Sequence, residues 1–93
     1  MQKTRPVVLV SNNAANRAAA VVTVVPLTSN TGRVYPFEVL LPRERTGLAK
    51  NSKAMAQQVR TIDKARLNAR PAGELSARDV QLLDPALRLH LAL

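Results

Sequence analysis

Val21-Val22-Thr23-Val24-Val25-Pro26-Leu27-Thr28 is the stretch of sequence that decides the fold, because β-branched and apolar residues fill it almost without interruption. Side chains of this kind suit a pleated, buried surface, so the stretch predicts a strong β-strand over residues 21–28. Pro26 has no backbone N–H to give to a neighbouring strand, which predicts an edge position or a bulge near the end of this strand.

Two further apolar runs flank this strand. Pro6–Ser11 is almost wholly apolar and leads into Asn12-Asn13, which predicts a strand that is buried on both faces and ends in a turn. Residues 13–20 are rich in Ala and polar side chains and predict a loop or one helical turn. After the turn residues Ser29–Arg33, the run Val34–Leu41 predicts a third strand. Three strands at this spacing favour a mostly β fold, a small antiparallel barrel or half-barrel.

The sequence between residues 49 and 67 gives a mixed signal. Ala, Lys, Met and Gln favour a helix, whereas Val59–Ile62 favours a strand. We therefore predict a strand for the second half of residues 49–61. Asp63–Leu67 predicts a short helical turn, and residues 68–73 predict a polar loop.

The C-terminus carries the clearest helix signal. Ser76 and Asp79 have the spacing of a capping box, with Asp in place of the usual Glu. The apolar residues that follow fill a wide arc at helical spacing: Val80, Leu82, Leu83, Ala86, Leu87, Leu89, His90, Leu91 and Leu93. Such a helix must bury two sides, and we expect one side to cover the sheet and the other to face a partner subunit. Pro85 predicts a kink or, with Asp84 as N-cap, a second helix start.

Length and charge set limits on the function. A chain of 93 residues allows one compact domain, so we treat residues 1–93 as a single domain. Aromatic residues make up only 2% of the chain, so the core is thin and dimerisation would help it.

Fourteen Lys and Arg against six Asp and Glu give a formal charge of +8, which favours an anionic partner such as a nucleic acid. A solvated basic surface without a ligand explains the composition about as well.

The residue inventory excludes several classes of protein. Without cysteine the chain has no disulfide, no thiolate catalysis and no Cys-based zinc site, and with one His a metal site would need mainly carboxylates. We therefore expect no metal and no cofactor. No apolar run approaches the length of a membrane span, and Met1–Arg5 lacks the apolar core of a signal peptide. We expect a cytoplasmic protein.

Five segments together resemble the MazF/PemK toxins in order and spacing. They are Arg5-Pro6-Val7-Val8-Leu9-Val10-Ser11-Asn12, Val25-Pro26-Leu27-Thr28-Ser29-Asn30, Tyr35-Pro36-Phe37-Glu38-Val39, Gln58-Val59-Arg60-Thr61-Ile62-Asp63-Lys64 and residues 84–93. The resemblance implies a strongly bent antiparallel sheet of SH3-like or CcdB-like type with a C-terminal helix, assembled as a homodimer with an RNA groove. It also implies an endoribonuclease, or mRNA interferase, that cleaves single-stranded mRNA at a short sequence and is neutralised by a cognate MazE-type antitoxin.

The resemblance also assigns functional residues. The Arg of the Arg-Pro step and the Thr that ends the second strong strand correspond to Arg5 and Thr28, the expected catalytic pair. The expected RNA contacts are Ser29, Asn30, Gln58 and Arg60. These residue types fit a reaction without a metal, in which the 2′-hydroxyl of the RNA attacks the adjacent phosphate. A guanidinium suits the charge that builds on the phosphorane, and a hydroxyl donates to a phosphate oxygen.

Simpler interpretations stand beside these assignments. Ser29 and Asn30 are turn-forming residues first, and surface polarity explains Gln58 and Arg60 almost as well as RNA binding does.

His90 and the two aromatic residues also call for a choice between roles. His90 is the only side chain whose ordinary pKa lies near neutrality, but it lies among leucines, so a structural or interface role is favoured over catalysis. Tyr35 and Phe37 could stack on bases, and core packing explains them at least as well.

The chain departs from the family pattern in three places. Complete members have another strand and a long loop before the Arg-Pro step, where this chain has only Met1–Thr4, and this predicts an unpaired sheet edge. Gln57 and Pro85 stand where members usually carry an acidic residue, so Gln57 is expected to raise the positive charge of the groove.

Two other functions stay open: a truncated, non-catalytic toxin homologue that binds only antitoxin or RNA, and a CcdB-like gyrase poison. The Arg-Pro and Thr-Ser-Asn segments argue against the gyrase poison.

Overall fold

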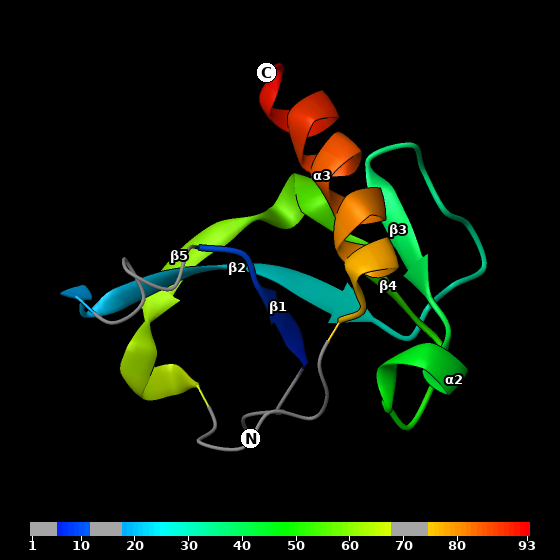
Figure 1. Ribbon diagram of the computed structural model, residues 1–93, viewed down its shortest axis with the longest axis horizontal. Helices are drawn as coiled ribbons and strands as arrows, with labels where there is room; N and C mark the ends of the chain where they lie inside the picture. Colours follow the sequence, from blue (N-terminus) through cyan, green and yellow to red (C-terminus); the bar gives the residue numbers. More distant parts are fainter. Residues whose placement is uncertain (1–5, 12–17, 68–74) are drawn as a thin grey trace.

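One long strand, β2 (Val21–Thr28), holds the sheet together. The computed structural model describes residues 6–11, 18–67 and 75–93. The other strands are β1 (Val7–Leu9), β3 (Glu38–Leu41), β4 (Ser52–Met55) and β5 (Arg60–Asp63). β1, β4 and β5 all pair with β2, β3 pairs with β4, and each of these pairings is antiparallel (Figure 1). The strand predicted at residues 21–28 is confirmed with the predicted bounds.

Pro26 lies inside β2 and not at an edge of the sheet. The Leu27 N–H donates to the Pro6 carbonyl at 3.1 Å, toward β1, and bonding directions alternate along an antiparallel strand, so Pro26 faces the opposite side. On that side, followed along β2, the pairing with β5 stops at Val24 and the pairing with β4 starts at Leu27. The missing N–H of Pro26 therefore leaves no ladder bond unmade. The predicted edge position is wrong, and Pro26 marks the point where β2 changes partners.

β1 is shorter and less buried than the sequence predicted. The strand expected over Pro6–Ser11 covers Val7–Leu9. Val8 packs against the core, whereas Leu9, which points to the opposite face, is 46% exposed. Burial on both faces is therefore wrong, because Val7 and Val8 are only half-buried and Leu9 is exposed.

The sheet is open. Within the residues described, no pairing joins β3 to β1 or to β5, so the strands do not close into a barrel. The mostly β, α+β class with a C-terminal helix is confirmed. The SH3-like or CcdB-like barrel describes this sheet only loosely, because β1, β3 and β5 each keep one edge unpaired among the described residues.

β3 begins four residues later than the predicted Val34–Leu41 strand. The Glu38 N–H donates to the Tyr35 carbonyl at 2.9 Å, which closes a turn with Pro36 in the position that turns favour. The Tyr35 N–H meanwhile donates to the Glu38 carboxylate at 3.0 Å. These backbone groups are used by the turn, so the strand ladder starts only at Glu38.

The mixed segment contains a strand that propensity alone did not resolve. β4 consists of Ser52–Met55, with a Lys-Ala-Met sequence that favours a helix in isolation. It forms a strand because it pairs with β2 on one side and with β3 on the other, and such pairing outweighs a weak local preference. A 3₁₀ turn, η1 (Ala56–Gln58), then leads to β5.

The remaining predictions for the second half are mostly confirmed. The strand expected from Val59–Ile62 is β5, and the helical turn expected at Asp63–Leu67 is the 3₁₀ turn η2 (Lys64–Arg66). The loop predicted at residues 68–73 lies outside the described residues, as does most of the loop or turn predicted at residues 13–20.

The C-terminal helix, α3 (Ala77–Leu91), begins where the capping box predicted. The Asp79 N–H donates to the Ser76 hydroxyl at 3.2 Å, and the hydroxyl donates to the Asp79 carboxylate at 3.1 Å. Pro85 neither ends nor restarts the helix, so the predicted second helix start is wrong. Proline removes the bond to the Gln81 carbonyl, but Gln81 is exposed and water can satisfy that oxygen.

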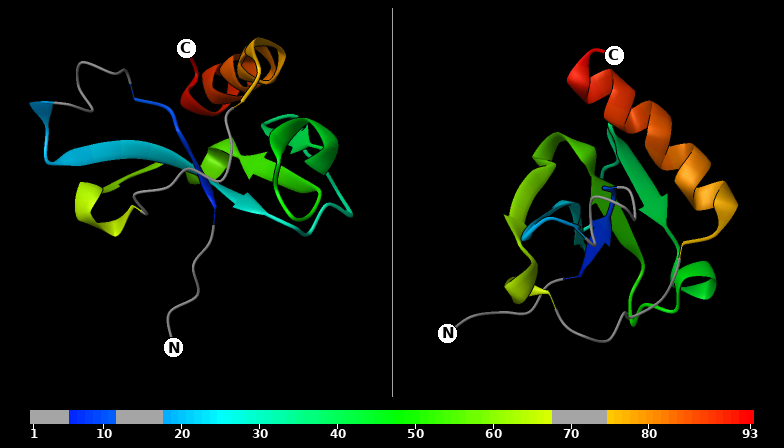
Figure 2. Two further views of the ribbon diagram at one scale, coloured as in Figure 1. Left: turned by 60° about the horizontal axis from the view of Figure 1, so that its bottom comes forward. Right: turned by 60° about the vertical axis from the view of Figure 1, so that its left-hand side comes forward.

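α3 covers one face of the sheet (Figure 2). Leu83 and Ala86 are buried against a core of Val25, Leu27, Val39, Leu41, Ala54 and Ala56. The large apolar residues left exposed on or just beyond the helix are Val80, Leu82, Leu89, Leu91 and Leu93. One of the two sides expected to be buried is thus covered within the chain. None of the described helices is long and apolar enough to span a bilayer.

An ion pair with a buried carboxylate joins the start of α3 to the short helix α2 (Arg43–Thr46). The Arg45 guanidinium donates to the Asp79 carboxylate at 2.9 Å, and the Asp79 side chain is fully buried. Asp79 therefore serves both the helix cap and a contact between segments that are far apart in sequence.

This double role predicts a graded loss of stability. Ser76→Ala should lower the free energy of unfolding by about 1 kcal/mol through loss of the cap. Asp79→Ala should cost more, about 2–3 kcal/mol, because it also leaves Arg45 without its charged acceptor. Urea unfolding at one fixed protein concentration measures both values. Arg78→Ala, an exposed position on the same helix, is the control, and an Asp79→Ala variant as stable as this control would contradict the assignment.

Candidate functional site

A row of side chains lies on the face of the sheet that points away from α3. Thr28 is directly opposite Lys53, and Lys53 is directly opposite Leu40. Directly opposed residues share a face, and so do residues two apart along a strand, which adds Glu38 and Met55 to the row. The intervening residues Leu27, Ala54, Val39 and Leu41 point into the core beneath α3. We call the surface formed by Thr28, Lys53, Leu40, Glu38 and Met55 the outer face.

Thr28 lies at the last position of β2 and is half-buried on the outer face. Its hydroxyl oxygen accepts from the Asn30 N–H at 3.2 Å. The hydroxyl acts there as an acceptor, so its proton is available to donate to another group. The position suits a group that must be held in place and still offer a hydrogen bond.

Ser29 and Asn30 continue directly from Thr28 and are exposed. The Asn30 side-chain oxygen accepts from the Gly32 N–H at 3.4 Å, a local bond of the kind that stabilises turns. The turn predicted here is confirmed. Contacts of Ser29 and Asn30 with RNA remain predictions, and the exposure of both side chains beside Thr28 is compatible with them.

Arg5 lies outside the described residues, so its side chain is not placed. It is bonded to Pro6, whose carbonyl accepts from the Leu27 N–H at 3.1 Å. The Pro6–Val7 peptide is therefore tied to Leu27, the residue that precedes Thr28.

Gln58 and Arg60 are not brought next to Thr28. Gln58 ends η1 and Arg60 begins β5, and both are exposed. Arg60 pairs with Val24, four residues before Thr28, which puts it about 13 Å away along the strand at about 3.3 Å per residue. Their role as RNA contacts stays a prediction.

His90 is exposed on α3, which packs against the face opposite to Thr28. No cluster of three or more His, Cys, Asp or Glu side chains suited to a metal ion occurs in the described parts of the chain.

A buried ion pair on the outer face was not foreseen from the sequence. The Lys53 ammonium donates to the Glu38 carboxylate at 2.9 Å and to the Arg33 carbonyl at 2.6 Å. Lys53 is 9% exposed and Glu38 is 7% exposed. No sequence spacing indicates this contact, because the two residues are 15 apart and meet only through the register of β3 with β4.

Gln57 completes this network. Its side-chain N–H donates to Glu38 at 2.7 Å, and its own oxygen is buried without a hydrogen-bond partner among the described residues. Burial raises the pKa of Glu38, but hydrogen bonds from the Tyr35 N–H, Gln57 and Lys53 outweigh it and hold the pKa below its ordinary value of 4.5. Gln57 is thus the neutral complement of a charged Glu38, and its amide points to that carboxylate.

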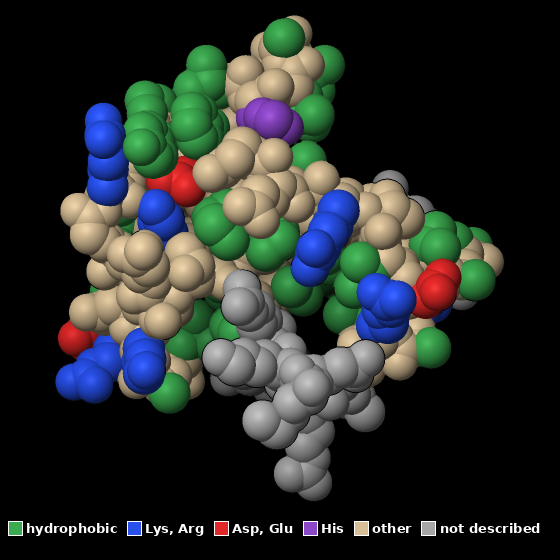
Figure 3. All heavy atoms as spheres, turned by 180° about the vertical axis from the view of Figure 1, so that it is seen from behind, with side chains coloured by type: hydrophobic (Ala, Val, Ile, Leu, Met, Phe, Trp, Pro, Cys, Tyr) green, Lys and Arg blue, Asp and Glu red, His purple; other side chains and the backbone are tan. Residues whose placement is uncertain are grey.

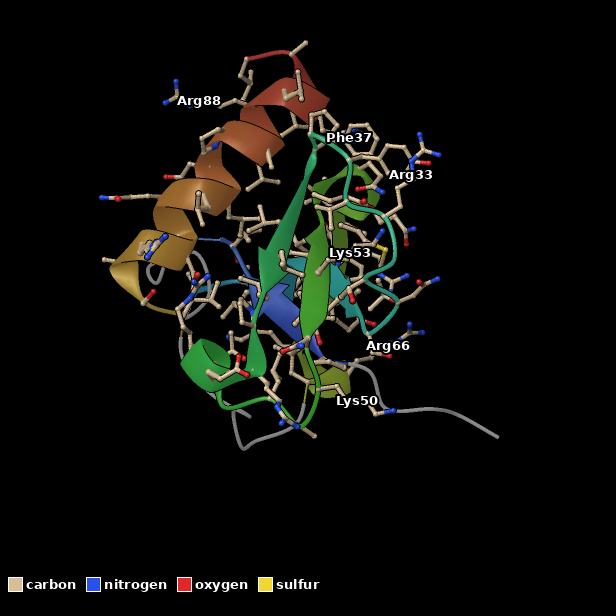
Figure 4. All side chains as sticks on the ribbon, turned by 90° about the vertical axis from the view of Figure 1, so that its right-hand side faces the viewer. Arg33, Phe37, Lys50, Lys53, Arg66 and Arg88 are labelled. Atoms are coloured by element: carbon tan, nitrogen blue, oxygen red, sulfur yellow. The ribbon has the colours of Figure 1, made fainter. Side chains whose placement is uncertain are left out.

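Tyr35 and Phe37 form a stack in the connection between β2 and β3. Their ring centroids are 5.4 Å apart and their planes differ by 8°. The Arg33 guanidinium lies 4.7 Å from the centre of the Tyr35 ring. Tyr35 is 39% exposed, so core packing is the wrong interpretation for it. Figure 4 shows Arg33, Phe37 and Lys53 on neighbouring parts of the molecule.

The sequence profile of PemK-like, MazF-like toxins of type II toxin–antitoxin systems matches residues 1–91. The chain belongs to this toxin family. It is 51% identical over 94 aligned positions to the endoribonuclease MazF9 of Mycobacterium tuberculosis, covering 96% of this chain and 79% of that toxin. This relationship confirms the resemblance inferred from the five segments.

Solved structures of MazF toxins have the same fold. The Mycobacterium tuberculosis toxin MazF-mt6 superposes with a TM-score of 0.86 at 27% identity, over 96% of this chain and 87% of that one. A mycobacterial endoribonuclease in complex with its cognate antitoxin superposes with a TM-score of 0.79 at 31% identity, over 96% and 82% of the two chains.

The Glu38–Gln57 contact predicts a rescue between two substitutions. Gln57→Glu should destabilise the toxin at pH 7 by about 1–3 kcal/mol, because two carboxylates in hydrogen-bond contact cannot both stay charged. Combining it with Glu38→Gln restores one carboxylate and one amide, so the double variant should recover most of the loss. Urea unfolding tests both variants. A Gln57→Glu variant as stable as the native toxin, or a double variant with no recovery, would contradict the network.

The lowered pKa of Glu38 predicts a pH dependence. A carboxyl group whose pKa is lower in the folded than in the unfolded state stabilises the fold fully above the unfolded value and loses this contribution as pH falls through the folded value. The native toxin should therefore lose stability more steeply below pH 4.5 than Glu38→Gln does. Urea unfolding of both proteins across this range measures the difference, and parallel curves would argue against it.

Proposed function

We propose that this toxin is an endoribonuclease that cleaves single-stranded mRNA at a short sequence without a metal and is held inactive by a cognate antitoxin. The observation that carries the proposal is Thr28, which ends β2 on the outer face with a hydroxyl proton free to donate. The 51% identity to an endoribonuclease supports it.

The proposed reaction uses the RNA as its own nucleophile. A bond forms between the 2′-oxygen and phosphorus as the bond from phosphorus to the 5′-oxygen breaks. A proton passes overall from the first oxygen to the second, which leaves a 2′,3′-cyclic phosphate and a 5′-hydroxyl. Thr28 donates to a phosphate oxygen, and the Arg5 guanidinium stabilises the charge on the phosphorane. Arg5 is suited to this role because it stays charged and offers a fixed fork of donors.

RNA binding draws on the basic surface of the toxin. The formal charge of +8 favours a polyanion, and Lys and Arg side chains lie among exposed apolar ones on the face seen in Figure 3. Ser29 and Asn30 extend this proposed contact from Thr28, and Gln58 and Arg60 are proposed to bind parts of the RNA farther from the cut. An acidic antitoxin segment would compete for the same charge, and the solved complex of a related endoribonuclease with its antitoxin supports such a partner.

We further propose that the toxin acts as a homodimer in the cytoplasm. Large apolar side chains are exposed on α3 and on the sheet, among them Leu40 and Leu89, and they offer a surface that a second copy would cover. Cytoplasmic action follows from the proposed substrate, because mRNA is found there. Light scattering of the purified toxin tests the dimer.

Cleavage of a long unstructured RNA in the presence of EDTA tests the activity. We expect cyclic phosphate ends with the native toxin, and a rate about a hundredfold lower with Thr28→Ala, because a donor to the developing charge is lost. Thr28→Ser should retain most of the rate, and Arg5→Lys should lose most of it, because an ammonium lacks the donor fork. Thr61→Ala, an exposed threonine on β5, is the matched control.

The same assay separates the other functions. RNA binding without new ends would favour a non-catalytic homologue that only binds antitoxin or RNA. Absence of any RNA contact would reopen the CcdB-like gyrase poison. The 51% identity to an endoribonuclease argues against that function.

A further inference from the structure

The only two aromatic residues of the chain form an ordered stack at the surface. The Phe37 and Tyr35 rings lie nearly parallel with centroids 5.4 Å apart, and Arg33 lies 4.7 Å from the Tyr35 centroid. Phe37 is half-buried, Tyr35 is 39% exposed and Arg33 is exposed. The arrangement thus opens toward solvent at its Arg33 end. We call these three residues the aromatic stack.

This exposure is unusual for a chain with so little aromatic area. Aromatic rings are the largest apolar groups available for a core, and in the part of the chain that the structure describes the buried hydrophobic core consists of Val, Leu and Ala. The fold leaves its two rings on the loop that follows Thr28. Their stacking therefore contributes little to the core. Phe37 stacks on the Tyr35 ring and the Arg33 guanidinium lies over the same ring, so the surface left for a ligand is the exposed side of Arg33.

The buried ion pair holds the backbone of the aromatic stack. Lys53 donates to the Arg33 carbonyl at 2.6 Å, and the Tyr35 N–H donates to Glu38 at 3.0 Å. The Glu38 N–H donates in turn to the Tyr35 carbonyl at 2.9 Å. Burying a lysine and a glutamate carries a desolvation cost, and here the side chains of the pair hold two backbone groups of an exposed loop, the Arg33 carbonyl and the Tyr35 N–H. A surface that is fixed in advance loses less entropy when it binds a ligand.

The aromatic stack lies close to Thr28. Lys53 is directly opposite Thr28 in the register of β2 with β4, and the ammonium of the same lysine contacts the Arg33 carbonyl. One strand spacing and one lysine side chain therefore separate the proposed catalytic threonine from the stack. Figure 4 shows Arg33 and Lys53 on the side of β4 that faces away from α3.

We infer that the aromatic stack is a nucleobase-binding platform for single-stranded RNA, on which an unpaired base next to the cut stacks at the exposed Arg33 end. The inference rests on the proposed function and assigns part of its substrate site. Unpaired bases stack on aromatic rings and on guanidinium planes, and the basic surface favours a polyanion over other flat ligands. Because every base has a π face, the platform contributes affinity for RNA and not the choice of sequence.

The chain provides its own reporter for this contact. Tyr35 is the only tyrosine and there is no tryptophan, so intrinsic tyrosine emission comes from the platform alone. A mixed-sequence 2′-O-methyl oligoribonucleotide is the probe, since it lacks the attacking hydroxyl and is not cleaved by the proposed reaction. We expect it to quench the emission, after correction for its absorbance, in parallel with binding measured by anisotropy. Tyr35→Phe should bind like the native toxin and show no such emission.

Two substitutions test stacking against other roles. Tyr35→Leu should weaken binding of the probe about tenfold, because a base loses its aromatic support. Arg33→Lys keeps the charge but loses the guanidinium plane, so it should also weaken binding, whereas a simple phosphate contact would tolerate lysine. Arg78→Lys on α3 is the matched control. Far-ultraviolet circular dichroism checks folding, and the surface variant Arg33→Lys decides the question if Tyr35→Leu does not fold.

The outcomes separate this inference from the proposed function. Binding with unchanged Tyr35 emission, together with native affinity in Tyr35→Leu and Arg33→Lys, would overturn the platform and leave the endoribonuclease proposal standing. Failure of the native toxin to bind the probe would count against both. Quenching by an acidic peptide but not by the oligonucleotide would assign the aromatic stack to a protein partner and overturn the RNA platform.

Discussion

The change of partner in the middle of β2 is the constraint on which the rest of the structure depends. β5 pairs with the first half of this strand and β4 with its end, and Pro26 lies between them, where no ladder bond is needed. The two halves of the sheet can therefore take different orientations in the fold. This arrangement gives β3 and β4 one face for α3 and leaves Thr28 on the other face.

The outer face owes its order to charges that are not exposed. Glu38 and Lys53 lie almost fully inside the protein, and each also bonds to the backbone of the loop that follows Thr28. The formal charge of +8 thus attracts RNA at long range, while the Glu38–Lys53 pair sets the local geometry of the loop. Attraction of RNA and positioning of the loop are separate physical tasks, carried by different residues.

Much of the fold could be predicted from local patterns, and the parts that failed depend on pairing. The strand at 21–28 and the Ser76 cap follow from β-branched composition and capping spacing. β4 could not be predicted, because Lys53 and Ala54 become strand residues only between β2 and β3. At the site, Thr28 was found by resemblance, whereas Lys53 and Gln57 reach Glu38 only through the folded register. Arg5 lies outside the described residues.

The break at Pro26 also bears on how such a chain can change in length during evolution. Neither β4 nor β5 passes this proline, so a residue gained or lost in the intervening η1 segment changes neither the register of β4 nor that of β5 with β2, although it would move Gln57 relative to Glu38. A single residue inserted within β4 would instead exchange the two faces of the strand, so that Lys53 would point toward the core and Ala54 toward the outer face. A change of length at this junction therefore leaves both strand registers in place, whereas a change of length a few residues earlier, inside β4, does not.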